Sequence, residues 1–562
     1  MSQTSTTTLI EIIPPAAISL PPLAILKTPA FESTTLHHDT PTSSTSKASS
    51  IRGIQLIGSS SGGALESQQT LSTDKPDADM PKLKAALVII TVASVTFLNS
   101  MFSGILTVGL PTIAADLALQ PNLLLWPASV YALTCGCTLL LSGAIADVVG
   151  SRFMYLTGCG MLAAFTLGCG LARTGIQLIL CRAFAGIAIS FCLPSAVSII
   201  TDTFSTGQRR NIAFASLGAA QPVGFSAGLV LGGVLIDSVG WRYGYYIGAG
   251  ITVLIFLSAM WGLPKNSART APVTWRRFAY DIDWVGATLA SSSLGMISYV
   301  FAMATASISR LRDPMNITLL CIAVALLPTF VLWVSRQERL GRPAIIPNSL
   351  WRNRVFTCIC IVVFLCWAVF NAVQYFITLF FQEVQNLSVL QTSLRFLPMV
   401  FSGCLTNVAT GFLVQRVRAN ILVVGAGAIT CLAPLMMAIA NPSWTYWSCA
   451  FIATLLSPIG ADTLFTVSNL VITSVFPPRT HGLAGGVFNT LSQIGNSVGL
   501  AVTAILASSV TARSHPANKS SPEALMQGYR ATFWACLGAM LLTVLISACG
   551  LRRIGKVGLK KE

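Results

Sequence analysis

The feature that most limits the fold is a series of long apolar runs, each close to the ~20 residues that an α-helix needs to cross a bilayer. The chain is 53% hydrophobic and only 10% charged, whereas a soluble protein carries about 25% charged residues. The sequence therefore predicts an all-α polytopic membrane protein. Fourteen runs follow one another: 86–110, 123–145, 153–172, 176–200, 212–236, 243–263, 283–304, 316–335, 355–381, 392–414, 420–440, 445–472, 484–508 and 530–549.

The basic residues lie at the ends of these runs and predict the orientation of the chain. If the N-terminus is cytoplasmic, the cytoplasmic segments hold many Lys and Arg residues, such as Arg209 with Arg210 and Arg336 with Arg339. The outer loops hold far fewer, as the positive-inside rule requires. We therefore expect both termini in the cytoplasm. The net charge of +16 then needs no nucleic-acid partner to explain it.

Three Asn-X-Ser/Thr sequons start at Asn316, Asn386 and Asn518, and all three fall on the outer side. Such triplets are common by chance, so they support the orientation only weakly. We predict N-glycosylation at Asn386 and Asn518. Asn316 lies too near the membrane to be modified.

Two glycine-rich segments indicate an internal repeat. Gly224-Phe-Ser-Ala-Gly228-Leu lies in the fifth run, and Gly495-Asn-Ser-Val-Gly499-Leu lies in the thirteenth. Each is the fifth helix of a six-helix block if the seventh and eighth runs are an insertion. Weak symmetry between halves is typical of transporters, although glycine-rich helices also resemble one another by chance.

The repeat predicts five regions along the chain. Residues 1–84, rich in Ser, Thr and Pro, form a disordered cytoplasmic tail. The rest comprises an N-terminal six-helix bundle (85–264), two additional transmembrane helices with cytoplasmic linkers (265–350), a C-terminal six-helix bundle (351–550) and a basic cytoplasmic tail (551–562).

The stretch 224–233 is unusually rich in glycine for a helix. Gly224, Gly228 and Gly232 are four residues apart, so they share one face and let a second helix approach closely. One interpretation is a tight structural crossing. The other is a seam, with Gly233, that stays sealed while a transporter changes conformation.

Several motifs resemble those of a known family. Gly143-Ala-Ile-Ala-Asp147-Val-Val-Gly150-Ser-Arg152 can be read as a helix end followed by a positive-inside arginine. Its complete spacing, however, is similar to the signature loop of the major facilitator superfamily. Arg182-Ala-Phe-Ala-Gly186 resembles that superfamily's Arg-X-X-Gln-Gly motif, with Ala185 replacing Gln. Residues 224–233 resemble its antiporter motif, with Leu229 replacing Pro.

The fourteen runs, together with residues 485–495, resemble the fourteen-helix drug:proton antiporter family. The amino-acid sequences of the first two runs are similar to those of its fungal toxin and multidrug efflux branch. The resemblance implies a major facilitator fold of two six-helix bundles plus two inserted helices. It also implies proton-coupled efflux of small amphipathic compounds, either drugs or self-made secondary-metabolite toxins, by alternating access at the plasma membrane. A proton-coupled importer of siderophores or nutrients remains the alternative.

Four charged residues are candidates for proton coupling or gating: Asp147, Arg152, Arg182 and Asp462. The family often has an aspartate in the first span, but Phe102 stands at that position here. Arg182 lies inside the fourth run, where it can snorkel outward or contact substrate. Asp462 lies inside the twelfth run, where it can bind a proton or accept hydrogen bonds from N–H groups freed by Pro458. Arg182 and Asp462 can face each other across a central cavity.

Polar and aromatic stripes predict the lining of that cavity. In the thirteenth run Gly495 and Gly499 lie roughly 90° from the amide face, which separates a packing face from a cavity face. The same polar groups can instead form hydrogen bonds between helices. The predicted lining residues are Asn99, Trp367, Asn371, Gln374, Tyr375, Asn489 and Gln493.

The sequence contains no nucleotide-binding loop, nucleophile elbow or zinc motif. The 15 cysteines fall within apolar runs and are interpreted as small core hydrophobes. We therefore expect no catalytic or metal site and no cofactor. The expected partners are a small-molecule substrate, protons and the lipid bilayer, with no nucleic acid, and the protein is expected to be a monomer.

Overall fold

The computed structural model describes residues 81–120, 123–204, 208–264, 275–304, 312–475, 481–514 and 521–552. All of them belong to one compact unit, Thr73–Glu562. The predicted disordered tail before residue 81, the sequon at Asn518 and the basic tail after residue 552 lie outside the described residues.

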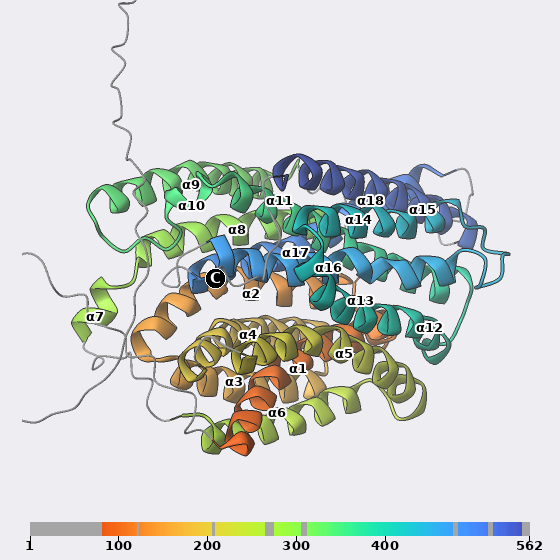
Figure 1. The fold of residues 1–562 in the computed structure, drawn as a ribbon. Helices are drawn as coiled ribbons and strands as arrows, with labels where there is room; N and C mark the ends of the chain where they lie inside the picture. Colours follow the sequence, from red (N-terminus) through yellow and green to blue (C-terminus); the bar gives the residue numbers. More distant parts are fainter. Residues whose placement is uncertain are drawn as a thin grey trace, which may run out of the picture. The chain divides into compact units, whose positions relative to one another are not determined.

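Fourteen spans among the described residues are long and apolar enough to cross a membrane, as predicted (Figure 1). Single helices form ten of them: α1 (Lys82–Asp116), α2 (Trp126–Val149), α3 (Ser151–Leu171), α4 (Gly175–Thr203), α5 (Gln208–Ser238), α6 (Arg242–Gly262), α8 (Trp284–Ala304), α9 (Pro314–Arg339), α16 (Ala450–Val475) and α17 (His481–Arg513). An eleventh is α18 (Pro522–Gly550). The short helices α7 (Trp275–Tyr280) and α10 (Asn348–Trp351) lie between spans.

The other three spans are made of two pieces each. Helix α11 (Arg354–Leu379) continues into η4, a π-helical turn at Phe380–Val384. The next span consists of α12 (Val389–Arg395) and α13 (Leu397–Arg416), and the one after it of α14 (Ala419–Thr430) and α15 (Leu432–Ile439). Pro398 stands in the first turn of α13, where its missing N–H ends the hydrogen-bond ladder of α12.

The helices form two six-helix bundles with the same internal packing (Figure 1). In the first bundle α1 packs on α5 and α6, while α3 packs on α4 and α6. In the second bundle α11 packs on α17 and α18, while α14 and α15 pack on α16 and α18. The first and fifth helices of each bundle are therefore neighbours, as are the third and fourth. The bundles meet where α2 packs on α17 and where α5 packs on α12 and α13.

Helices α8 and α9 are additional to the two bundles and pack on each other. Helix α8 rests on α2, where the rings of Tyr299 and Trp126 meet edge to face with centroids 5.7 Å apart. In α9, only 11% of an apolar stretch of 18 residues is buried. Because this stretch is strongly apolar, its exposed surface suits contact with lipid.

Two faces of the molecule can be defined from the chain direction. Helix α1 begins and α2 ends at the face that carries Lys82, Arg152, Arg354 and Arg416, which we call the basic face. Helices α1, α5 and α17 end at the other side, which we call the opposite face. The sequence predicts that the basic face is cytoplasmic.

The glycines of α5 form two different contacts. A Cβ atom added at Gly224 or Gly228 would overlap a backbone carbonyl of α1, and one at Gly232 would lie 3.0 Å from Cα of Ile105. These three glycines therefore hold a close crossing inside the first bundle. Gly233 instead faces α12, where an added Cβ would lie 3.2 Å from Cα of Leu390 in the other bundle.

The second bundle repeats the first of these contacts. A Cβ atom added at Gly495 would lie 2.5 Å from the carbonyl oxygen of Phe364. One added at Gly499 would lie 2.5 Å from Cα of Ala368. Helix α17 therefore crosses α11 as α5 crosses α1. The two glycine-rich segments occupy corresponding places in the bundles.

Candidate functional site

A cavity of about 550 Å³ lies between the two bundles. Helices α1, α2, α4 and α5 line one side, and α11, α13, α16 and α17 line the other. Its lining reaches Thr201, Arg210 and Gly485, which lie near the basic-face ends of their helices. Toward the opposite face the lining ends at Leu110 of α1, Ala128 in the first turn of α2 and Leu500 of α17. The cavity therefore extends toward the basic face.

Contacts between the bundles close the opposite face. Nε2 of Gln382, in η4, donates a hydrogen bond of 2.9 Å to the carbonyl oxygen of Val108 in α1. The backbone N–H of Leu390, in α12, donates to Oδ2 of Asp237 in α5 at 3.0 Å. Gly233 packs beside these bonds. Sequence reasoning missed Gln382 and Asp237, because neither residue belongs to a stripe or motif.

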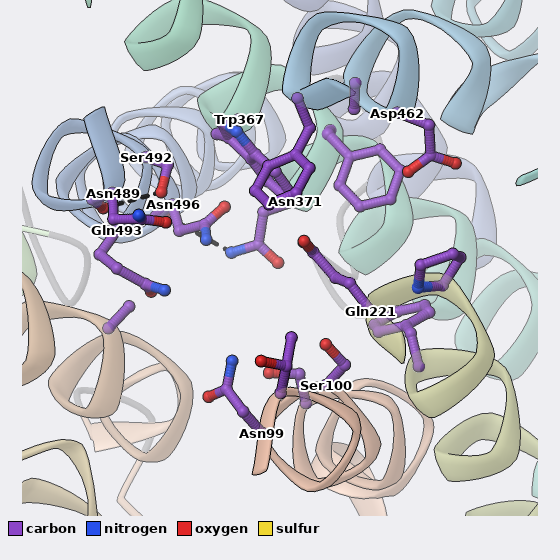
Figure 2. A pocket seen from close by; sticks show the side chains of 18 of the residues that line it. Asn99, Ser100, Gln221, Trp367, Asn371, Asp462, Asn489, Ser492, Gln493 and Asn496 are labelled. Carbon is purple, nitrogen blue, oxygen red and sulfur yellow. Dashed lines mark hydrogen bonds between the residues drawn. The ribbon is translucent and has the colours of Figure 1, made fainter. Parts of the chain in front are cut away.

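Amide side chains line the cavity from both bundles, among them Asn99, Asn371, Asn489 and Gln493. Figure 2 shows Asn99 on one side of the cavity and the other three facing it. Several of these amides are also hydrogen-bonded: Nδ2 of Asn371 donates to the carbonyl oxygen of Asn496 at 3.3 Å. The two interpretations of the stripes are therefore compatible. The same helices fix the amides and present them to the cavity.

The cavity also has an aromatic wall, which includes the predicted Trp367 and Tyr375. The Trp367 and Phe370 rings are nearly perpendicular, with centroids 5.8 Å apart. The centroid of the Phe370 ring in turn lies 6.5 Å from that of the Phe225 ring in the other bundle. Nε1 of Trp367 is buried and has no hydrogen-bond partner among the described residues.

Gln374 does not line the cavity, contrary to the predicted set. It is 1% exposed, and its Nε2 donates to Oγ of Ser457 in α16 at 2.9 Å. Helical periodicity places Gln374 on the correct side of α11. At this level, however, α16 packs against α11 and covers it.

Gln221 of α5 lines the cavity and was not predicted (Figure 2). The sequence contains a signal for it, because Gln221 is a polar residue in an apolar run and directly precedes Pro222. The neighbouring glycines mark the opposite, packing face of this helix.

Arg182 is turned inward and does not snorkel. It is 3% exposed, its Nε donates to the carbonyl oxygen of Pro127 at 3.0 Å, and its guanidinium lies 4.4 Å from the centre of the Tyr131 ring. The Tyr131 hydroxyl donates to Oδ1 of Asn99 at 2.6 Å. These contacts link Arg182 to the amides at the cavity wall.

Asp462 is the only acidic side chain among the described residues that line the cavity. It is partly exposed, and its Oδ2 atom is buried without a hydrogen-bond partner in the described part of the chain. A Cβ atom added at Gly403 of α13 would lie 2.9 Å from that oxygen, and Asn407 of α13 is within hydrogen-bonding reach of the carboxyl group. Asp462 and Arg182 both line the cavity but form no ion pair with each other.

Asp147 and Arg152 lie at the basic face, away from the cavity lining. The turn between α2 and α3 needs Gly150, whose φ is 107°. Arg152 donates to the carbonyl oxygen of Met260 in α6 at 2.7 Å and makes no ion pair with Asp147. The arginine therefore ties α3 to α6, and the Asp147 side chain is exposed.

The predicted glycosylation site Asn386 lies in the loop between η4 and α12 at the opposite face. Its side chain is exposed and its φ is 53°. Asn316, which the prediction excluded, is only 7% exposed.

Comparison with known proteins places the chain in a family. The family model described as Major Facilitator Superfamily matches residues 92–500. MFS-type transporter 1 of Pyricularia oryzae is 47% identical over 526 residues, which cover 85% of each chain. Two more distant relatives are the low affinity ammonium transporter of Saccharomyces cerevisiae, 25% identical over 75% of this chain and 80% of that one, and efflux pump terJ of Aspergillus terreus, 24% identical over 85% and 90%.

A solved structure has the same fold. It is a bacterial homolog of the human lysosomal transporter Spinster, in an inward-facing and unoccupied conformation. The likeness has a TM-score of 0.57 with 16% identity and covers 84% of this chain and 98% of that one. With two six-helix bundles, a cavity between them and a family model that matches most of its length, the chain belongs to the Major Facilitator Superfamily of membrane transporters.

Proposed function

We propose that the protein is a proton-driven exporter of small amphipathic organic compounds that works by alternating access. The observation that carries the proposal is the cavity between the bundles, which reaches the basic face and is closed at the opposite face. A substrate can enter such a cavity only from the basic face. Opening the Gln382 and Asp237 contacts would expose it to the other side.

The chemistry of the cavity supports an amphipathic substrate. Its volume of about 550 Å³ lies within the ~300–1,000 Å³ of drug-sized pockets. Amides can donate or accept hydrogen bonds, and the aromatic wall offers flat apolar surface. Surfaces of this kind discriminate weakly among bulky compounds. We propose drugs or secondary-metabolite toxins as the substrate class, as in the fungal toxin and multidrug efflux branch.

Asp462 is the proposed proton-binding residue of the cavity. A carboxylate inside a membrane is costly unless it is paired, and this one has no cationic partner within 4.0 Å among the described residues. Binding a proton removes the charge. Arg182 then acts from the other bundle through the field across the cavity. Asp147 and Arg152 are proposed to contribute to gating at the basic face.

We place the protein in the plasma membrane as a monomer with both termini in the cytoplasm, so that the basic face is cytoplasmic. The five-region division remains part of this proposal: 1–84, 85–264, 265–350, 351–550 and 551–562. Efflux is supported by the relative named as an efflux pump. Import is the second candidate, because another relative is named as an ammonium transporter.

A transport assay in cells decides between these directions. Cells with and without the chain are first grown on a panel of amphipathic toxins and dyes. Import is tested separately by measuring the uptake of labelled methylammonium. We expect lower accumulation of a tolerated compound in cells that carry the chain, and loss of this difference when a protonophore collapses the proton gradient. Higher accumulation contradicts export, and a difference that survives the protonophore contradicts proton coupling.

A further inference from the structure

Arg182 brings a positive charge to the wall of the cavity, about two turns from the end of α4 at the opposite face. Its Nε atom donates to the carbonyl oxygen of Pro127. The guanidinium makes no other hydrogen bond to a described residue, so Nη1 and Nη2 are donors without acceptors. Neither nitrogen is one of the fully buried polar atoms without a partner. Both therefore remain within reach of the cavity.

The charge of Arg182 has no counterion in the described part of the chain. No acidic side chain there lies within 4.0 Å of it. The face of the Tyr131 ring attracts the guanidinium, whose central carbon lies 4.4 Å from the ring centre, but a ring face does not cancel a full charge. A buried charge without a counterion is costly. A negatively charged group on a ligand would supply the missing partner.

Asn99 adds a further hydrogen-bond donor to the same wall. Its Oδ1 atom already accepts the hydrogen bond from the Tyr131 hydroxyl. Its Nδ2 atom donates to no described residue, and Figure 2 shows the amide turned toward the cavity. The acceptors beside Arg182 and Asn99 are thus occupied, whereas their N–H groups are free. Free donors without free acceptors fit a carboxylate or sulfonate, which only accepts hydrogen bonds.

The charges of the whole cavity also favour an anion. Among the described residues that line it, the charged ones are Arg182, Arg210 and Asp462, two basic and one acidic. Arg210 lies near the basic-face end of α5, where the cavity opens. An anion that enters from the basic face therefore meets positive charge at the mouth and again at Arg182, and such fields guide charged ligands.

The aromatic wall defines the rest of the ligand. Figure 2 shows Trp367 across the cavity from Asn99, and the Phe370 ring lies beside Trp367. A molecule bound between the two walls would place its acidic group at Arg182 and Asn99. Its apolar body would then lie against the rings, where flat aromatic surface packs best.

We propose that the cavity binds amphipathic organic acids, whose carboxylate or sulfonate pairs with Arg182 and accepts a hydrogen bond from Nδ2 of Asn99. The planar guanidinium can bond to two oxygens of such a group at once, which a neutral substrate does not offer to the same degree. This proposal names the substrate class of the proposed exporter and rests on that function for the direction of movement. Binding of the acid requires neither movement nor a proton gradient.

The test measures binding to the purified full-length protein in lipid nanodiscs at pH 7.5, where a carboxylic acid is ionised. The probes are naphthalene-2-carboxylate and anthracene-2-carboxylate, each compared by calorimetry with its uncharged carboxamide of nearly the same shape. Hydrogen bonds to charged groups are the stronger ones, so each acid should bind about ten- to hundredfold more tightly than its amide. Amides that bind as tightly as the acids would overturn the proposal, and so would a failure of all four compounds to bind at millimolar concentration.

Substitutions of Arg182 identify the group that selects the acid. Arg182→Gln removes the charge and should lower the ratio of acid to amide affinity to about one. Arg182→Lys keeps the charge without the planar fork and should retain part of the preference. Arg173→Gln is the matched control, because Arg173 is exposed before α4 and does not line the cavity. An unchanged ratio in Arg182→Gln, or an equal loss in Arg173→Gln, would contradict the assignment.

Asn99→Asp tests the site from its other donor, and it decides the matter if Arg182→Gln does not fold. The introduced carboxylate would repel the acid of the ligand and compensate Arg182. The affinity for both acids should therefore fall by about tenfold or more, while the affinity for the amides stays. Acids that bind to this variant as they bind to the wild type would refute an anion site at Arg182 and Asn99.

The two proposals fail separately. Acid binding that depends on Arg182, in a protein that exports none of the compounds tested, would reject the exporter and keep the anion site. Gradient-driven export of neutral compounds, with no preference for acids in the binding measurement, would reject the anion site alone.

Discussion

Gln382 donates a hydrogen bond to the carbonyl oxygen of Val108 at 2.9 Å, and this bond joins the two bundles at the opposite face. A net hydrogen bond contributes about 0.5–1.5 kcal/mol. We expect Gln382→Leu to raise the ratio of open to closed molecules by about two- to tenfold. The measurement is the distance between spin labels attached at Ile176 and Trp444, two exposed positions at the opposite face in different bundles. Gln385→Leu is the matched control, because Gln385 bonds to Pro442 and Arg395 within its own bundle. Equal effects of the two changes would refute the role of the Val108 bond.

Gly228 marks the tightest part of the α1–α5 crossing, since an added Cβ would overlap the carbonyl oxygen of Met101. Gly228→Ala should force the helices apart and destabilise the fold by about 1–3 kcal/mol. Gly250→Ala should be neutral or stabilising, because no atom lies within 4 Å of its added Cβ. Thermal unfolding in detergent compares the two variants. Similar melting temperatures would contradict a close crossing.

Asp462 is the acid of the cavity, and Asp462→Asn cannot change its charge. We expect transport driven by the proton gradient to fall by an order of magnitude or more. Exchange of labelled for unlabelled compound, which needs no net proton movement, should persist. Asp313→Asn is the control, because Asp313 is exposed at the start of α9. Gradient-driven transport at the wild-type rate in Asp462→Asn would remove this residue as a proton carrier.

Trp367 presents an aromatic surface to the cavity beside Phe370. Aromatic pairs contribute about 0.5–1.5 kcal/mol beyond area burial. Trp367→Ala should therefore raise KM for aromatic compounds by about two- to tenfold and affect aliphatic ones less. Trp534→Ala serves as the control, since Trp534 is 50% exposed on α18 and does not line the cavity. A uniform loss across all compounds would indicate a defect in folding instead.

Asn386 is exposed at the opposite face. If that face is extracytoplasmic, Asn386→Gln should reduce the mass of the protein made in a glycosylating host, as seen after glycosidase treatment. Asn316→Gln should leave the mass unchanged, because Asn316 is nearly buried. No mass change in either variant would remove this support for the orientation.

The spans were predictable because membrane insertion depends on a local property. About 20 consecutive apolar residues suffice, so the runs around α9 or α18 can be recognised without knowing their neighbours. The close crossings were predictable for a related reason. Only small residues spaced by four allow two backbones to touch, and Gly224 with Gly228 and Gly495 with Gly499 show that spacing directly.

Part of the site followed from the same periodicity. Asn371, Tyr375, Asn489 and Gln493 face the cavity because a helix repeats its faces every 3.6 residues. Gln374 marks the limit of this reasoning. Its direction on α11 was right, but the depth at which α16 covers the helix depends on how two distant segments pack.

The membrane crossings, the flat helix faces and the polar helix faces could all be read from the amino-acid order, since they are properties of single helices. The groups that contact one another became known only from the packing of the helices. Arg152 bonds to Met260, Gln382 to Val108 and Tyr529 to Glu383, and each pair is separated by more than a hundred positions. Hydrogen bonds and charge compensation act over a few ångströms in space, whereas the pattern of one helix contains no information about which helix lies beside it.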